Sequence, residues 1–230
     1  MHKLTFALFV LLALLAFRTE AQAQIEIVQS GKSLTGGNAG GVRYHYLFEN
    51  ERFTTPLQEI ELDGQGQGRF RFKRKDADET VINLKVSASL LSQIQTLFDS
   101  LNFLSSKEDY QHKKDFSHLG TVTIGQSRNG QERTVKFNYT TNELMNQLRD
   151  IFQNLTTQET RIYELEVIRA NDPLSSPAQL RLLESELKSK HIADPQRFVP
   201  ILQDLKLDES VPLITRNHAE RLLQAIKKGK

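Results

Sequence analysis

The chain has 230 residues, of which 38% are hydrophobic and 25% are charged, and its formal net charge at pH 7 is +2. These proportions are typical of a folded globular protein, and so small a charge gives no overall attraction to nucleic acid or to an anionic membrane. The chain has no cysteine, which excludes disulfides, thiol catalysis and cysteine-ligated zinc or iron–sulfur sites.

The first 23 residues have the pattern of a cleaved secretory signal peptide. Lys3 provides a positive start, residues 4–17 are apolar and uncharged, and Ala21-Gln22-Ala23 is an A-x-A cleavage site. The apolar run is shorter than the roughly 20 residues needed to span a bilayer. The sequence therefore predicts an exported protein, periplasmic or secreted, that is cleaved after Ala23 and is not stably inserted in a membrane afterwards.

Residues 25–86 show the alternation of apolar and polar side chains that is typical of antiparallel strands with one solvated face. We expect strands at residues 25–28, 42–48, 57–62, 69–74 and 80–86. Glycine-rich segments at residues 31–41 and 64–68 separate some of them. Neither segment fits a phosphate-binding motif, because Glu26 stands where a P-loop ending in Gly31-Lys32-Ser33 requires glycine.

The loop at residues 31–41 is glycine-rich and longer than an ordinary hairpin connection. Long polar loops of this kind serve recognition more often than packing. We expect its central residues to contact a partner: Gly36, Gly37, Asn38, Gly40 and Gly41. A disordered loop without a partner is the alternative.

Helical periodicity begins at residue 87. Apolar side chains recur three or four positions apart and form one stripe: Leu90, Leu91, Ile94, Leu97, Phe98 and Leu101. Beyond this helix, the alternating segments 121–126 and 132–139 flank Asn129-Gly130, a dipeptide that supplies the positive φ angles of a two-residue hairpin turn. The sequence thus predicts a helix followed by a β-hairpin.

From residue 140 to the end the pattern is helical. Thr140 and Glu143 have the spacing of a capping box at the start of a helix. Proline marks the later boundaries, with a break at Asp172-Pro173 and new helices at Ser176-Pro177 and Asp194-Pro195. The last helix is expected to bury one apolar face: Val211, Ile214, Leu222 and Ile226, with His218 as a packed, hydrogen-bonded residue among them.

These elements predict an α+β fold, in which an antiparallel sheet with two packed amphipathic helices is followed by an all-helical C-terminal segment. The composition changes near residue 156. We therefore divide the chain into a signal peptide (1–23), an α+β domain (24–156) and a helical C-terminal region (157–230), with the helical region expected to dock on the sheet.

Residues 108–118 gather side chains that can bind metal ions. His112, Asp115 and His118 are evenly spaced, and histidine with carboxylate is a common ligand set. Lys113 and Lys114 lie between them and would repel a cation. We interpret the segment as a solvated polar loop and assign no catalytic, metal-binding or cofactor-binding residue, with an enzyme centred on these three side chains as the alternative.

Basic and aromatic residues alternate at positions 69–75. On a strand, Arg69, Arg71 and Lys73 point to one face, and Phe70 and Phe72 point to the other. The aromatic rings are expected in the core and the cations in water. An acidic partner or a polysaccharide on the cationic face is the alternative.

The segment 25–155 resembles the emfourin-like domains, small bacterial proteins with members that inhibit thermolysin-type metalloproteases. The matching features are residues 25–31 opening a strand, Ala39-Gly40-Gly41 leading into the next strand, the helix at 90–101, the hairpin at 121–139 and the helix from Glu143. The resemblance implies a protease partner. It does not cover the helical region, the glycine-rich loop and residues 65–75 depart from it, and it assigns no inhibitory residue here.

The function expected from the sequence is that of an exported, non-catalytic protein that binds another protein, in the manner of a protease inhibitor. The basis is a globular sequence that carries no complete catalytic set. A metal-dependent or other envelope enzyme using the 108–118 loop, and a purely structural envelope protein, are the alternatives. The identity of the partner and the oligomeric state do not follow from the sequence.

Overall fold

A computed structural model describes residues 41–229 of the chain. Within this range, six strands form one antiparallel sheet in the order β4-β3-β2-β1-β5-β6. The strands are β1 (Arg43–Glu49), β2 (Leu57–Asp63), β3 (Gln67–Lys73), β4 (Glu79–Lys85), β5 (Thr121–Arg128) and β6 (Gln131–Phe137). The helices are α2 (Ala88–Ser100), α3 (Glu143–Asn171), α4 (Ser176–Lys188), α5 (Val199–Leu207) and α6 (Leu213–Lys227). The fold is α+β, as predicted.

The strands and turns form where the sequence pattern places them. Asn129 and Gly130 connect β5 to β6 with φ angles of 53° and 79°, which confirms the predicted hairpin. Gly66 closes the turn between β2 and β3 at a φ of 75°, and a Cβ atom there would lie 2.8 Å from Val86 Cγ2. The expected strand at residues 25–28 lies outside the described residues.

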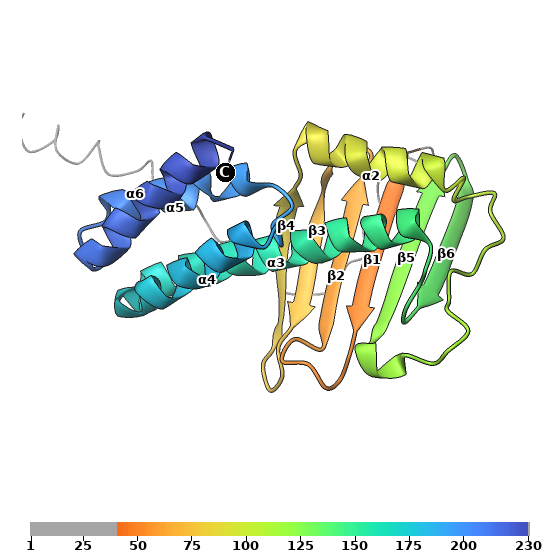
Figure 1. Ribbon diagram of the computed structural model, residues 1–230, viewed down its shortest axis with the longest axis horizontal. Coiled ribbons are helices and arrows are strands. Elements are labelled where there is room, and N and C mark those ends of the chain that lie inside the picture. The colour runs from red at the N-terminus through yellow and green to blue at the C-terminus, as the bar shows by residue number, and fades with distance from the viewer. Residues whose placement is uncertain (1–40, 230) are drawn as a thin grey trace, which may run out of the picture.

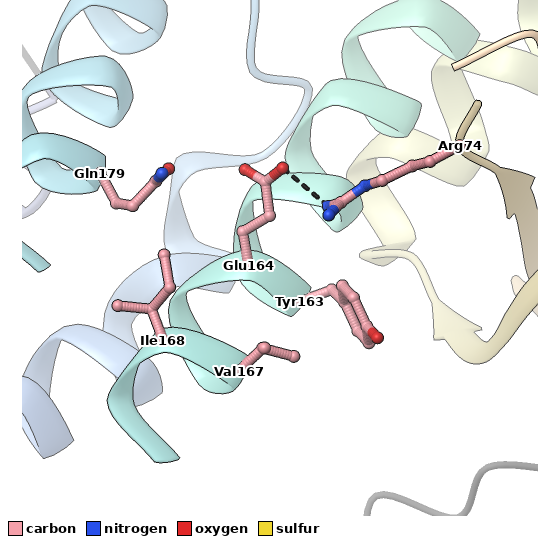
Figure 2. Close-up of a pocket in the computed structure, with 6 residues that line it drawn as sticks. All are labelled: Arg74, Tyr163, Glu164, Val167, Ile168 and Gln179. Atoms are coloured by element: carbon pink, nitrogen blue, oxygen red, sulfur yellow. Dashed lines mark hydrogen bonds and ion pairs between the residues drawn. The ribbon is translucent and has the colours of Figure 1, made fainter. Parts of the chain in front are cut away.

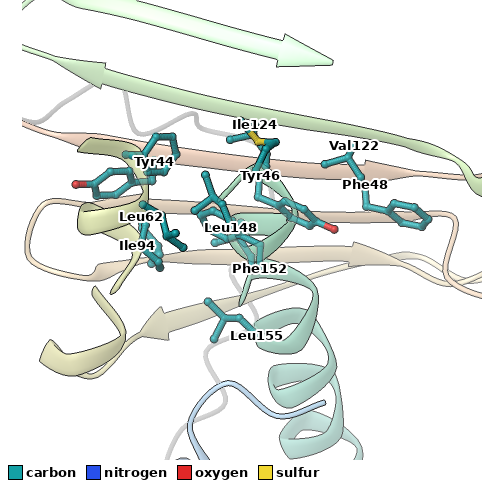
Figure 3. Packing of buried hydrophobic residues seen from close by; sticks show 14 of the residues in the cluster. Tyr44, Tyr46, Phe48, Leu62, Ile94, Val122, Ile124, Leu148, Phe152 and Leu155 are labelled. Carbon is teal, nitrogen blue, oxygen red and sulfur yellow. The ribbon is translucent and has the colours of Figure 1, made fainter. Parts of the chain in front are cut away.

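Helices α2 and α3 lie side by side across one face of the sheet (Figure 1). Alternate residues of the strands point into the core between the sheet and these two helices. Most of the largest buried side chains in this core are aromatic. Figure 3 shows the centre of this core, where Tyr46 of β1 meets Leu148 and Phe152 of α3. The rings of Tyr46 and Phe152 stack with their centroids 5.2 Å apart. None of the described helices covers the opposite face of the sheet (Figure 1).

Helix α3 joins two separate hydrophobic cores. Residues of its first half, up to Leu155, belong to the core under the sheet. Ile162 and Leu165 of its second half belong to a second core in the helical part of the chain. The domain boundary expected near residue 156 therefore falls inside a continuous helix of 29 residues. We call residues 41–155 the sheet unit and residues 156–229 the helical unit.

The start of α3 differs from the predicted capping box. The N-cap is Asn142, whose side-chain oxygen accepts a hydrogen bond from the backbone N–H of Met145 at 3.0 Å. Thr140 is buried, and its hydroxyl oxygen accepts from the backbone N–H of Asn142 at 3.2 Å. Asn142 directly precedes the first helical residue, so its short side chain reaches the free N–H groups of the first turn.

The helical unit packs α4, α5 and α6 against the second half of α3 (Figure 1). Short 3₁₀ turns precede two of these helices, η2 (Pro173–Ser175) before α4 and η3 (Pro195–Phe198) before α5. His218 of α6 is buried and its Nε2 atom lies 3.0 Å from Glu184 Oε2 of α4, which confirms a packed, hydrogen-bonded histidine.

A buried polar layer separates the two cores. Glu159 of α3 is 1% exposed, and its carboxylate accepts hydrogen bonds from Gln158 Nε2 at 2.8 Å and from Arg197 at 3.2 Å. The side-chain oxygen of Gln158 accepts from the backbone N–H of Asp194 at 2.7 Å. Buried polar groups must be paired to avoid a desolvation cost, so these bonds fix the position of the segment before α5 against α3.

Candidate functional site

The glycine-rich loop predicted to contact a partner lies mostly outside the described residues. This holds for Gly36, Gly37, Asn38 and Gly40. Gly41 is described, is exposed, and lies two residues before β1. The loop therefore stays a prediction.

The segment 108–118 is held against the end of β6 by hydrogen bonds. The backbone N–H of His112 donates to the carbonyl of Tyr139 at 2.9 Å, and the side-chain oxygen of Gln111 accepts from the backbone N–H of Asn138 at 2.8 Å. Arg133 of β6 donates to the carbonyl oxygen of Phe103 at 2.6 Å and also to that of Glu108. The segment is thus a fixed connection along the edge of the sheet.

The three metal-capable side chains of this segment contact other residues of the segment itself. His112 Nδ1 accepts from the backbone N–H of Lys114 at 3.0 Å, and Asp115 accepts from the backbone N–H of Ser117 at 2.7 Å. The ring of Phe116 contacts both histidines, with centroids 5.4 Å from His112 and 6.2 Å from His118. Across residues 41–229, no three His, Asp or Glu side chains are grouped to hold a metal ion.

The cations of β3 face carboxylates on the neighbouring strands. An Arg69 nitrogen lies 2.8 Å from Glu61 of β2, and Arg71 donates to Glu59 of β2 at 2.6 Å and to Glu79 of β4 at 2.9 Å. Antiparallel register places these residues opposite or diagonal to one another. The cations that suggested an acidic partner are therefore largely balanced by the protein's own carboxylates.

His45 of β1 extends this row of charges across the sheet. Its Nε2 atom lies 2.9 Å from Glu59 Oε1. The hydrogen bond from His45, together with that from Arg71, lowers the pKa of Glu59, although partial burial acts in the opposite direction. Glu59 is therefore ionised and shared between β1 and β3 at neutral pH.

A pocket of about 140 Å³ lies at the joint between the two units (Figure 2). Its lining comes from the β3–β4 connection, α3 and α4: Arg74, Tyr163, Glu164, Val167, Ile168 and Gln179. Arg74 bridges the joint through an ion pair with Glu164 at 2.8 Å. The volume is well below the roughly 300 Å³ at which ligand pockets usually begin.

The polar groups around this pocket are bonded to one another. Arg161 of α3 donates to the side-chain oxygen of Gln179 at 2.6 Å and to both oxygens of Glu186 of α4 at 3.0 and 2.6 Å. Burial alone would lower the pKa of Arg161, but the contacts with Glu186 and Glu164 outweigh it and raise the pKa. The pocket is thus part of a structural joint that ties the sheet edge to α3 and α4.

The most exposed large apolar side chains gather at the opposite end of the helical unit. Leu174 is 77% exposed, Leu207 75%, and Leu213 and Ile214 61% each. Leu174 belongs to the turn between α3 and α4, and the other three flank the turn between α5 and α6. Figure 1 shows both turns at the end of the helical unit that points away from the sheet. We call these four residues and their two turns the distal tip.

Hydrogen bonds hold the two turns of the distal tip together. Arg169, near the end of α3, donates to Asp204 and to Asp208 of the α5–α6 region, each at 2.8 Å. Asp208 also accepts from the backbone N–H of Ser210 at 2.9 Å and from its hydroxyl at 2.6 Å. The Ser210 hydroxyl and the Arg169 guanidinium lower the pKa of Asp208 from 3.8 to about 2. The exposed apolar side chains of the distal tip therefore lie in or beside turns whose positions these hydrogen bonds fix.

The distal tip was missed by the sequence patterns. Ile214 was expected on the buried face of the last helix, and this was wrong, because Thr215 is buried in its place. Val211, Leu222 and Ile226 are buried as predicted. Ile214 lies in the first turn of α6 and is exposed, whereas Leu222 and Ile226, farther along the same helix, are buried. The one sequence signal for the tip is Leu174, an apolar residue directly after the helix break at Asp172-Pro173.

The chain was compared with known proteins. No protein-family model and no curated protein sequence matches it. The resemblance to emfourin-like domains therefore stays a prediction. Among residues 41–229, no helix combines the length and the apolar character that a membrane crossing requires.

Proposed function

We propose that this chain is an exported, non-catalytic protein that acts by binding another protein, and that the distal tip is the contact surface. The supporting observation is the position of the exposed apolar side chains. The four highest exposures among the large apolar residues of the described range all lie in or beside two turns that Arg169 connects. Contiguous exposed apolar patches mark sites of protein interaction, whereas scattered ones do not.

The chemistry of the tip is suited to docking. Its leucines are supported by ion-paired and hydrogen-bonded turns, so little conformational entropy is lost when a partner packs on them. The buried Val211 anchors the α5–α6 turn in the core directly beneath. A preorganised apolar surface with a polar rim is the usual design of a binding site for a protein.

Affinity capture with the mature chain, residues 24–230, tests the proposal. The wild type is compared with Leu207→Ser/Leu213→Ser at the tip and with Leu119→Ser, an exposed apolar residue of the sheet unit that is 42% exposed. We expect one partner from the exported fraction to bind the wild type and the Leu119 variant and to be lost from the tip variant. Retention of the partner by the tip variant would assign binding elsewhere.

The glycine-rich loop provides a second arm of the same experiment. Shortening residues 31–40 should leave the partner bound if the tip alone makes the contact, and should weaken binding if the loop contributes. The emfourin-like resemblance names a thermolysin-type metalloprotease as the partner class to assay first. Unchanged protease activity at a molar excess of the chain would rule that class out.

Export itself is tested by processing. Amino-terminal sequencing of the exported protein should give Gln24 as its first residue, because cleavage is expected after Ala23. An exported protein that retains Met1 would contradict the signal peptide.

A further inference from the structure

The face of the sheet turned away from α2 and α3 has no cover among the described helices (Figure 1). We call it the open face. Side chains alternate between the two faces along a strand, so Leu47 of β1 lies on the open face between the core residues Tyr46 and Phe48. Thr123 of β5 is the direct cross-strand neighbour of Leu47 and therefore also lies on the open face. These two residues belong to the middle of the sheet.

Thr123 is shielded from water although it lies on the open face. It is 3% exposed, and its hydroxyl is buried without a hydrogen-bond partner among residues 41–229. Lys136, its cross-strand neighbour on β6, is exposed. A hydroxyl can donate one hydrogen bond and accept others, and leaving it buried and unpaired is costly. The centre of the open face therefore fits an occupant that brings both apolar contact and a polar group to Thr123.

The charges beside Thr123 on the open face are paired with each other. In the row of cross-strand neighbours that contains Thr123, Leu47 is followed by Glu59 of β2 and Arg71 of β3, which form an ion pair. Val81 of β4 ends the row and is partly buried. Electrostatic complementarity therefore favours an occupant with little net charge of its own.

Residues 24–40 have the composition that this surface requires. Their only charged residues are Glu26 and Lys32, which carry opposite charges. Ile25 and Ile27 stand two positions apart and point to the same side of an extended chain. This segment can therefore place two apolar side chains on a surface while its backbone groups remain free to form hydrogen bonds there.

The chain also enters the described structure at a suitable place. Gly41 lies two residues before β1, the strand that carries Leu47. To cross the open face beside β1, the preceding chain must turn back and then run the length of a seven-residue strand. Residues 31–40 are rich in glycine and can form the turn. Residues 24–30 then provide the run across the face.

We propose that residues 24–30 fold back over the open face, with Ile25 and Ile27 packed against Leu47 and Thr123, and that a backbone group of this segment bonds to the Thr123 hydroxyl. The segment follows the predicted cleavage site after Ala23, so it is the amino terminus of the mature chain. The open face is thus a surface for the chain's own amino terminus, separate from the distal tip.

Cysteine reactivity tests this proposal, because the chain has no cysteine of its own. Thr123→Cys is placed in the mature chain, residues 24–230, and its alkylation is timed in buffer and in urea. We expect the folded chain to react about a hundredfold more slowly or less, as at a site that reacts only on local opening. Adding Ile25→Asp/Ile27→Asp should raise the folded rate about tenfold or more, because the segment would have to bury two charges.

Two matched variants control for other effects. Ser33→Asp/Thr35→Asp adds the same charge to the glycine-rich loop and should leave the reactivity of Thr123→Cys unchanged. Ile124→Cys, on the core side of the same strand and 0% exposed, should stay protected with and without the two aspartates of the segment. Comparison of the two cysteine positions thus shows whether the segment shields the open face alone.

Two results would overturn the inference. One is alkylation of Thr123→Cys that is as fast in the folded chain as in urea. The other is protection that Ile25→Asp/Ile27→Asp leaves unchanged. If that protection fell on dilution of the protein, a second copy of the chain would be the cover. If it did not, the neighbouring strands would shield Thr123 without any added segment.

Ile27→Trp gives a second measurement that needs no added charge, since the chain has no tryptophan. The fluorescence emission of the folded mature chain should lie at a shorter wavelength than that of the chain in urea, because packing on the open face removes the indole ring from water. Emission at the same wavelength in both states would contradict the inference, whatever the aspartate variants show. Partner capture by the distal tip is decided independently of both measurements.

Discussion

The core of the sheet unit contains many aromatic rings, whereas the described core of the helical unit is mostly leucine and isoleucine around its single aromatic residue, Phe198. The two units also differ at their surfaces. Leu174, Leu207, Leu213 and Ile214 of the helical unit are each more than 60% exposed, while Phe53 and Leu119 of the sheet unit reach 47% and 42%. The sheet unit thus has the larger buried core, and the helical unit carries the exposed apolar side chains on which the proposed function rests. We refer to this difference as the division between the units.

Removing one fully buried phenylalanine from each core gives the largest expected effect. Phe152→Ala and Phe198→Ala should each cost about 3–5 kcal/mol, since both side chains are 0% exposed. Phe152 lies in the half of α3 that covers the sheet, so its loss should open both units. Phe198→Ala should open the helical unit alone. Hydrogen exchange distinguishes the two, and a Phe198 variant that also unprotects the amides of β1 would contradict the division.

The polar layer between the units gives a smaller effect. Glu159→Ala removes the acceptor of Gln158 and Arg197, and should lower the free energy of unfolding by about 1–3 kcal/mol. The cost should fall toward the lower end because the Arg197 side chain is 37% exposed and can turn to water. Asp150→Ala on the same helix is the control, because this carboxylate is exposed and pairs with its neighbour Arg149. Equal costs in urea denaturation would mean that the layer contributes nothing specific.

Acid should distinguish the units through two carboxylates whose pKa values are lowered. A carboxylate with a lowered folded pKa stabilises the protein above its unfolded pKa, and this contribution is lost as pH falls through the folded value. For Asp208 the window runs from about pH 3.8 down to about 2. For Glu59 the loss begins near the ordinary value of 4.5.

The variants Asp208→Asn and Glu59→Gln make this measurable. Each should be less stable than the wild type at pH 7, and the difference should close on acidification, for Glu59→Gln at the higher pH. The measurement is thermal unfolding of the wild type and both variants from about pH 7, where both carboxylates are ionised, down to about pH 2, near the folded pKa of Asp208. A stability difference for Asp208→Asn that stayed constant down to pH 2 would mean that its bonds to Ser210 and Arg169 do not favour the ionised form.

The smallest effect on stability is expected at the distal tip. Leu207→Ser should change the free energy of unfolding by no more than about 0.5 kcal/mol, because the side chain already lies in water. Leu205→Ser, two positions away and 0% exposed, should cost about 3 kcal/mol or more. If Leu207→Ser were comparably destabilising, Leu207 would be a core residue. The proposal that the distal tip is a binding surface would then be wrong.

The elements that could be predicted from sequence are those fixed by local rules. The period-two alternation located β1 to β4, and Asn129-Gly130 located the β5–β6 hairpin, because the turn needs positive φ angles that these residues adopt readily. The capping box was wrong because Asn142 offers a competing cap one residue before α3. Propensity alone does not decide which of two residues with cap-forming side chains begins the helix, since the Thr140 hydroxyl accepts from the N–H of Asn142 and the Asn142 side chain accepts from that of Met145.

The candidate site escaped prediction because it is defined by neighbours in space. Periodicity placed Ile214 on the same stripe as Leu222, but it does not show where the covering helices end. Leu174 and Leu207 are distant in sequence, and only the packing of α5 against α3 brings their turns together. A surface made from two turns has no signature within either one.

The central strand β1 has a consequence for the order of folding. It pairs with β2 on one side, across a short connection, and with β5 on the other, and the chain between β1 and β5 contains β2, β3, β4 and α2. Closing such a long loop precedes the gain from pairing, so β1–β5 docking is expected to be the slow step of the sheet unit. Until it occurs, the inner edge of the β5–β6 hairpin is open to strands of other chains. The concentration at which this protein refolds without aggregating should therefore depend on β1 more than on any helix.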